Sequence, residues 1–165
     1  MVPERLTITV ALEPPTGPDA QGLLWAYFQE MVSRYQLRPG RSDEVELAMA
    51  EDPSDDLVPP AGMFYLARRG STPVGCIGLR LRPNQVGQVT RVFVLSDERR
   101  RGVGARLMAE IEAAARDHKV RRLELDTRDD LVEARQLYES CGFVEVPAFN
   151  AGRYAEHWFA KQLEV

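Results

Sequence analysis

The residues best suited to chemistry form a glycine- and arginine-rich turn within residues 91–105, RVFVLSDERRRGVGA. A strand-like run over residues 92–94 enters this turn, and an amphipathic helical pattern follows it. The first backbone amides of a helix have no intrahelical acceptor and carry the positive end of the helix dipole. Gly102 and Gly104 would let another group approach that backbone closely. The turn is therefore suited to hold a phosphate group.

Three consecutive arginines, Arg99, Arg100 and Arg101, would add positive charge around such a phosphate. A structural interpretation also stays open, because glycines near a helix start can serve tight packing alone and an arginine run is commonly a solvated face. The two common nucleotide motifs do not fit. No Gly-x-x-x-x-Gly-Lys-Ser/Thr occurs, and the turn lacks the third glycine of the dinucleotide fingerprint.

The pattern of apolar residues predicts the elements that must position this turn. Strands are expected at residues 6–10, 63–67, 74–81, 86–95, 120–125, 143–146 and 158–163. Helices are expected after Asp19 as a cap, over 43–50, after the turn, and after a capping box of Asp130 and Glu133, with Gly142 ending the last one. The resulting order, β-α-α-β-β-β-α-β-α-β-β, predicts an α/β fold (α+β, with a mixed sheet) that has helices on both faces.

Length and charge limit the remaining choices. A chain of 165 residues suits one domain with a sizeable core, and its net charge of −4 would repel nucleic acid and anionic membranes. No apolar run reaches the roughly 18 residues of a membrane span, and the start of the chain does not resemble a signal peptide. Cys76 and Cys141 lie in apolar segments, as buried thiols of a reducing compartment do, so we expect a cytoplasmic protein. His118 and His157 lack ligand spacing, so no metal site is expected.

Two motifs together carry a family resemblance. Arg99-x-x-Gly102-x-Gly104, after the run Val92-Phe93-Val94, resembles the acyl-CoA-binding motif of the GNAT superfamily of N-acyltransferases. The stretch Ala134-x-x-Leu137-Tyr138-x-x-x-Gly142-Phe143 is similar to the second signature of that superfamily. The motifs occur in the expected order, and the element order matches over nearly the whole chain. The resemblance implies a single N-acetyltransferase domain over residues 1–165, with acetyl-CoA as co-substrate.

The resemblance also implies where acetyl-CoA would lie. Its pyrophosphate would rest on the backbone amides of the turn, namely those of Arg99, Arg100, Arg101, Gly102, Val103, Gly104 and Ala105. Backbone groups near Phe93 and Val94 would face the pantetheine arm and the thioester carbonyl. A backbone donor there would stabilise the oxyanion of a tetrahedral intermediate. Arg100 and Leu131 stand where many relatives have a small residue and an asparagine, respectively.

Tyr138 stands where the superfamily usually has its general acid, and a phenol with a pKa of about 10 can protonate a thiolate of similar basicity. Alternatively, Tyr138 is a core tyrosine whose hydroxyl is merely hydrogen-bonded. The general base is not identified. Many relatives have a glutamate on the strand before the turn, where this chain has residues 88–90, QVT. Asp126 ends the following strand on the same face as Glu124, where a cleft could reach it, but we favour the role of a solvated carboxylate or a helix-capping partner for it.

Three functions are thus compared. The first is an N-acetyltransferase that moves the acetyl group of acetyl-CoA to a primary amine of a small molecule or protein by direct attack. The second is a non-catalytic acyl-CoA-binding regulatory module. The third, a nucleic-acid binder using the arginines around the turn, is disfavoured by the acidic net charge. An acidic segment over residues 43–56 would attract a cationic amine or is simply a solvated face. The resemblance also allows a homodimer through the late strands.

Overall fold

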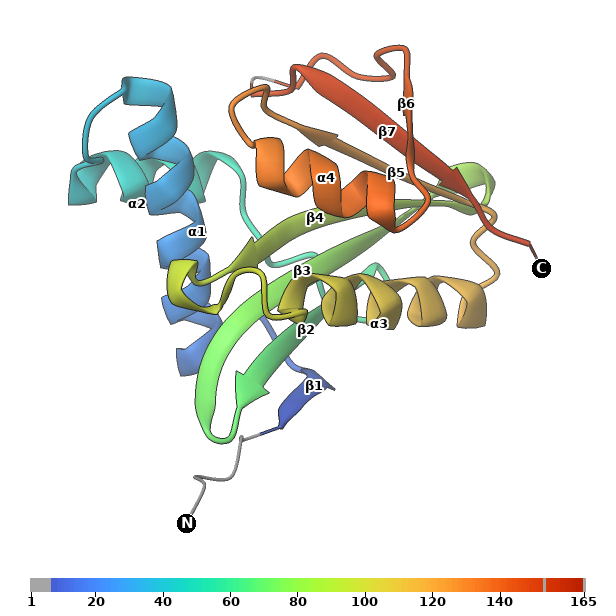
Figure 1. The fold of residues 1–165 in the computed structure, drawn as a ribbon, viewed down its shortest axis with the longest axis horizontal. Helices are drawn as coiled ribbons and strands as arrows, with labels where there is room; N and C mark the ends of the chain where they lie inside the picture. Colours follow the sequence, from blue (N-terminus) through green and yellow to red (C-terminus); the bar gives the residue numbers. More distant parts are fainter. Residues whose placement is uncertain (1–6, 153, 165) are drawn as a thin grey trace.

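The computed structural model describes residues 7–152 and 154–164, which form a mixed sheet with helices on both of its faces (Figure 1). The strands are β1 Ile8–Leu12, β2 Gly62–Arg69, β3 Thr72–Arg82, β4 Val86–Val94, β5 Arg122–Thr127, β6 Val144–Val146 and β7 His157–Gln162. The helices are α1 Pro18–Gln36, α2 Ser42–Glu51, α3 Val103–Asp117 and α4 Val132–Ser140. Two short 3-10 turns, η1 Pro83–Gln85 and η2 Ser96–Glu98, flank β4. The predicted fold class and element order are confirmed.

The sheet order is β1-β2-β3-β4-β5-β7-β6, with β4 and β5 as its parallel pair. Their pairing covers only Val86–Gln88 against Arg122–Glu124, after which the two strands are no longer paired. Beyond Gln88, the register between β4 and β3 shifts between Thr90 and Phe93. Arg91, within this segment, has a left-handed φ of 56°. A β-bulge of this kind bends its strand and increases the local twist. The bulge and the short parallel pairing together open the sheet along the second half of β4.

Two apolar clusters hold the helices to the sheet. On one face, α3 contributes Val103, Leu107 and Ile111 to a core that also includes Tyr138 from α4. On the other face, α1 contributes Leu23 and Leu24 to a second cluster. Burial of a leucine side chain is worth about 2 kcal/mol, so these clusters fix the helices to the sheet. The site is built where the elements of both clusters approach β4.

Side chains at the end of β4 alternate between the two faces of the sheet. Val92 and Val94 pack against the cluster on the α3 face, whereas Phe93 belongs to the cluster on the α1 face. The guanidinium of Arg91 lies over the ring of Phe28 on α1, with a centroid distance of 5.0 Å. Successive side chains of the strand therefore reach opposite faces of the sheet.

The start of α1 differs from the prediction, because the carboxylate of Asp19, which was expected to cap the helix, pairs with an arginine instead. α1 has Gly17 as its N-cap and Pro18 as its first residue. Asp19 lies inside the first turn and pairs with Arg68 on β2 at 3.0 Å. An acidic residue there still interacts favourably with the helix dipole. Leu6, expected at the start of β1, lies outside the described residues.

The capping box predicted for Asp130 and Glu133 is wrong. α4 follows Leu131 as its N-cap and has no side-chain cap. Asp130 instead pairs with Arg128 at 2.9 Å. A charged hydrogen bond between carboxylate and guanidinium is stronger than one to a backbone amide, so the carboxylate turns away from the helix. The predicted end of α4 is confirmed, since Gly142 has a φ of 90° directly after the C-cap, Cys141.

Candidate active site

A cavity of about 1110 Å³ is lined by α1, the separated parts of β4 and β5, the glycine-rich turn and α4. This volume is in the range of sites that enclose a ligand of cofactor size. The predicted site residues that line it are Phe93, Val94, Arg99, Arg100, Gly102, Gly104, Ala105 and Tyr138. The structure thus brings the two motifs, which are more than thirty residues apart in the chain, to one cavity.

The glycine-rich turn presents backbone donors at one end of this cavity. Gly102 is the N-cap of α3, has a φ of 85°, and offers no side chain to cap the first amides of the helix. That conformation favours glycine, because a Cβ would crowd the backbone. Gly104 lies in the first turn of α3, where a Cβ would come within 2.9 Å of Leu137 on α4. The uncapped amides therefore carry the partial positive charge of the helix toward the cavity.

Two predicted phosphate-binding residues, Arg101 and Val103, do not line the cavity. Val103 is buried in the core of the α3 face, so only its backbone amide belongs to the turn. The side chain of Arg101 is exposed and lies 3.5 Å from the carboxylate of Glu98. The charge expected from three arginines is reduced accordingly.

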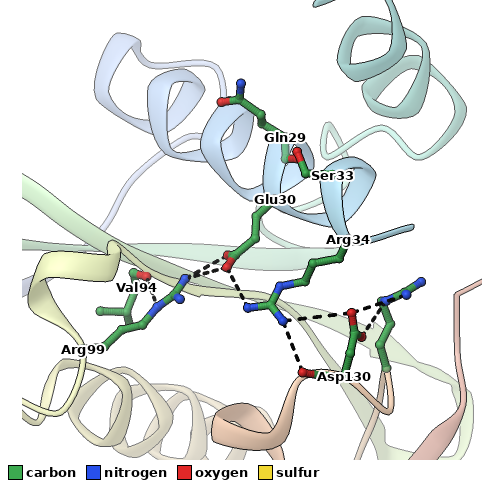
Figure 2. A network of polar contacts seen from close by, with 8 residues as sticks. Gln29, Glu30, Ser33, Arg34, Val94, Arg99 and Asp130 are labelled. Carbon is green, nitrogen blue, oxygen red and sulfur yellow. Dashed lines mark hydrogen bonds and ion pairs between the residues drawn. The ribbon is translucent and has the colours of Figure 1, made fainter. Parts of the chain in front are cut away.

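Arg99 is also neutralised, as Figure 2 shows. Its guanidinium donates to both carboxylate oxygens of Glu30 on α1 at 2.8 and 3.0 Å, and its Nε donates to the carbonyl of Val94 at 3.0 Å. A bidentate pair of this kind fixes geometry as well as charge. Arg99 therefore connects the turn to the end of β4 and to α1.

Arg100 differs from its two neighbours. It lines the cavity, and among the residues that the structure describes no carboxylate lies within 4.0 Å of its guanidinium. Its φ is 64°, a left-handed value that costs a non-glycine residue about 1–2 kcal/mol. The small residue expected from the resemblance at this position therefore has a conformational reason. Of the three arginines, Arg100 is the one placed to add charge at the turn.

Glu30 is a site residue that the sequence reading missed. It accepts from Arg99 and also from Arg34, which lies one turn further along α1 and donates in turn to the backbone carbonyl of Asp130 (Figure 2). Arg128 completes this network by pairing with the Asp130 carboxylate. The signal in the sequence was the i, i+4 spacing of Glu30 and Arg34, which is common on helix surfaces. The network joins α1, the turn and the β5–α4 loop around the cavity.

Tyr138 lines the cavity although it is 5% exposed. Its hydroxyl has no hydrogen-bond partner among residues 7–152 and 154–164, which disagrees with the interpretation of a merely hydrogen-bonded core tyrosine. Burial, with smaller contributions from Tyr27 and Asp126, raises the pKa of Tyr138. The hydroxyl is protonated at neutral pH, as a proton donor must be, and the raised pKa makes it a weaker acid toward a thiolate than an exposed phenol.

The far end of the cavity is built from paired charges. Arg91, 2% exposed, pairs with Asp52 at 3.1 Å and donates to Ser54 and to the carbonyl of Asp52. Arg80 pairs with Asp56 at 2.7 Å. The acidic segment after α1 is therefore partly neutralised by arginines of the sheet. Burial also removes Arg91 from any surface that could bind nucleic acid.

The cysteines and histidines have structural surroundings. Cys76 is buried, which raises the pKa of its thiol to about 12, and Cys141 is half-buried. His118 contacts the carbonyl of Ala114 near the C-terminus of α3. In the described part of the chain, no three His, Cys, Asp or Glu side chains gather in a way that could hold a metal ion. None of the helices described is long and apolar enough to cross a membrane.

Comparisons with solved structures agree with this architecture. An acetyltransferase of the GNAT family from Staphylococcus aureus superimposes with a TM-score of 0.76 at 17% identity, covering 96% of this chain and 100% of the other. The PaiA N-acetyltransferase from Thermoplasma acidophilum, in complex with coenzyme A, gives 0.72 at 14% identity, covering 94% and 99%. The IAA acetyltransferase from Bacillus cereus gives 0.64 at 17% identity, covering 95% and 100%. At these identities the likeness shows the fold.

A search of curated proteins finds no match for the chain. The model of the acetyltransferase (GNAT) family, in contrast, matches residues 21–143, which include the turn, the cavity-lining strands and Tyr138. Members of this family use acetyl-CoA as the acyl donor. The residues present fit such a donor, because the uncapped start of α3 offers amides to phosphate and the cavity extends from there along β4. The chain therefore belongs to the GNAT family of acetyltransferases, acyltransferases that use acetyl-CoA.

Proposed function

We propose that the chain is a single N-acetyltransferase domain that moves the acetyl group of acetyl-CoA onto a primary amine of a small molecule, or of a protein, by direct attack. One observation carries this proposal. A single cavity connects the uncapped amides of the α3 N-terminus with the hydroxyl of Tyr138, which has no partner among the described residues. Acetyl transfer from the CoA thioester needs both groups, because the amides can bind the phosphates of the donor and the hydroxyl can protonate the leaving sulfur.

The turn would hold the pyrophosphate on the amides of residues 100–105, with Arg100 adding charge, whereas the amide of Arg99 donates to the carbonyl of Ser96 at 3.4 Å. Beyond Gln88, the edge of β4 that faces β5 has no paired strand in the described part of the sheet. Its backbone groups near Phe93 and Val94 are therefore available to the pantetheine arm and to the thioester carbonyl. An amide aimed at that carbonyl would stabilise the oxyanion that forms as the amine attacks. The protein mainly aligns an already reactive thioester with an amine.

Tyr138 would protonate the leaving sulfur. As the amine nitrogen bonds to the acetyl carbon and the C–S bond breaks, the thiolate of CoA takes the phenolic proton. The phenolate regains a proton that the attacking nitrogen has released. The net reaction converts an ammonium and acetyl-CoA into an amide, CoA and one proton. The position of the hydroxyl at the cavity wall supports this role.

Binding is tested by calorimetric titration of acetyl-CoA, CoA and ATP into the purified protein. Binding of acetyl-CoA and CoA in preference to ATP is the expected result, and no binding of CoA would contradict the proposal. Release of CoA is then followed with a panel of primary amines. Cofactor binding without release on any amine would support the regulatory module instead.

Replacing Tyr138 by Phe tests the proton donor. We expect kcat to fall about 100-fold, because general acid catalysis contributes that much or more, while the Kd of acetyl-CoA changes little. Tyr65→Phe is the matched control, since Tyr65 is a half-buried tyrosine of β2 that does not line the cavity. An unchanged kcat in Tyr138→Phe would remove this residue from the chemistry and leave the acetyl-CoA site intact.

A further inference from the structure

Asp126 lies where the two central strands separate. It follows the last β4–β5 pair, Gln88 with Glu124, by two residues. Its neighbours in the strand, Leu123 and Leu125, are buried in the core, so Asp126 faces the other side, is half-buried and lines the cavity. Tyr138 lines the same cavity from α4. The structure therefore places a carboxylate next to the proposed reaction centre, in a role that the sequence pattern left open.

The partners of Asp126 distinguish it from the other half-buried carboxylates of the cavity. Glu30 is paired with Arg99 and Arg34, and Glu98 is paired with Arg69 and Arg101. Asp126 instead accepts one hydrogen bond, at 3.1 Å, from the neutral side-chain amide of Asn150. Within residues 7–152 and 154–164, no Lys, Arg or His lies within 4.0 Å of it. Among the described residues, its negative charge therefore has no cationic partner, in a cavity expected to receive a cation.

Asn150 is itself held in one orientation. Its side-chain oxygen accepts from the indole Nε1 of Trp158 at 2.9 Å and from the backbone amide of Gly152 at 3.2 Å. Because both contacts require an acceptor, the amide nitrogen is the atom that faces Asp126. One carboxylate oxygen is thereby occupied, and no described residue forms a hydrogen bond with the other. This chain of contacts gives Asp126 a fixed direction.

Two phenols are within electrostatic reach of Asp126. Burial raises the pKa of Tyr27 on α1, and the negative charge of Asp126 adds to the rise, as it does for Tyr138. Both tyrosines line the cavity. The carboxylate thus shares one cavity with side chains of α1 and α4, and an ammonium bound there would be attracted to it.

We propose that Asp126 is the general base of the reaction, held in position by Asn150. The proposal rests on the function proposed above. The free oxygen of Asp126 takes one proton from the ammonium, so that the N–H bond breaks, an O–H bond forms, and the nitrogen gains the lone pair that attacks the thioester carbon. As the C–S bond breaks, Tyr138 gives its phenolic proton to the CoA thiolate, and the resulting phenolate takes the second proton from the nitrogen. Asp126 later returns its proton to solvent, which accounts for the one proton released per turnover.

The first test compares two kinds of amine in Asp126→Asn. An alkylamine, with a pKa of about 10, must lose a proton before it can attack, whereas an alkoxyamine is already neutral at neutral pH. We expect kcat/KM to fall about 100-fold or more for the alkylamine and less than about 10-fold for the alkoxyamine. Asp126→Glu should recover part of the alkylamine rate. Equal losses with both amines, or no loss, would overturn the proposal.

Glu124→Gln is the matched control. Glu124 lies two residues earlier on the same face of β5, carries the same charge, and does not line the cavity. The acetyl-CoA affinity of each variant is measured in parallel and is expected to stay unchanged. A wild-type protein that binds no acetyl-CoA would defeat the proposed function and this inference together. A wild-type protein that turns over, with Asp126→Asn equally active on both amines, would defeat this inference alone.

Asn150 is a positioning residue, and Asn150→Ala tests it. We expect kcat for the alkylamine to fall about 10-fold with KM nearly unchanged, because the carboxylate stays in place but loses its direction. Trp158→Phe should give a smaller fall with the same pattern, since it removes one of the two donors that orient Asn150. A change in KM alone would assign Asn150 to acceptor binding and overturn the positioning role.

Discussion

The two ends of the cavity are built in different ways. At the turn, the interacting groups are backbone amides exposed by Gly102 and the start of α3, all within a few consecutive residues. At the far end, the groups are side chains from distant segments, such as Arg91 with Asp52 and Arg80 with Asp56, which are paired with one another. The backbone amides of the turn are available to a ligand. At the far end, most charged side chains are paired with one another and hold the loop after α2 against the sheet.

This difference explains which end is suited to a common co-substrate. A helix N-terminus binds phosphate with little dependence on neighbouring side chains, so the turn can stay the same while the rest changes. The far end depends on individual side chains of loops, which is where acceptor specificity is usually built. Asp126 on β5 and Asn150 in the loop between β6 and β7 belong to neither end, but both line the same cavity.

The substitution Arg91→Ala is expected to have the largest effect on stability, since it removes the arginine around which the paired charges of the far end are arranged. The variant should lose about 2 kcal/mol of the free energy of unfolding, because Ser54 and the backbone carbonyl of Asp52 lose a buried donor, whereas the carboxylate of Asp52 is more than half exposed and regains water. Urea denaturation measures this loss. Arg106→Ala, an exposed arginine of α3, should change stability by less than about 0.5 kcal/mol. Similar stabilities of the two variants would show that the far end does not depend on its paired charges.

The difference between the two ends of the cavity also explains which parts of the site could be predicted from the sequence. The turn follows from consecutive residues, and amphipathic patterns predicted the element order, because both depend on spacing along the chain. The partners of Arg99 and Asp126 could not be predicted, because Glu30 and Asn150 come from segments that only the fold brings together. The capping error at Asp130 has the same origin, since a capping rule considers local amides and not a nearby arginine.

Arg100→Gly should separate stability from binding at the turn. Glycine removes the cost of a left-handed φ but frees the unfolded chain, so we expect a net gain of up to about 1 kcal/mol in the free energy of unfolding. The affinity for acetyl-CoA should fall about fivefold, because a charge near the helix N-terminus is lost. Thermal unfolding and calorimetry measure the two changes. A variant that loses both stability and affinity would contradict the interpretation that Arg100 has a strained backbone and adds charge for binding acetyl-CoA.

Replacing His157 is expected to have the smallest effect on stability, and it concerns the loop between β5 and α4. Its ring nitrogens contact Asp129 at 2.8 Å and Glu145 at 2.6 Å, and these carboxylates raise the pKa of His157. Because the folded pKa exceeds the unfolded value of about 6.5, the stabilisation is complete below that pH and is lost as the pH rises through the folded pKa. Both carboxylates are exposed, so the contribution should stay below about 1 kcal/mol. We expect the stability difference between wild type and His157→Gln to shrink from slightly acidic to alkaline pH. A constant difference would mean that packing, and not charge, holds the β5–α4 loop against β6 and β7.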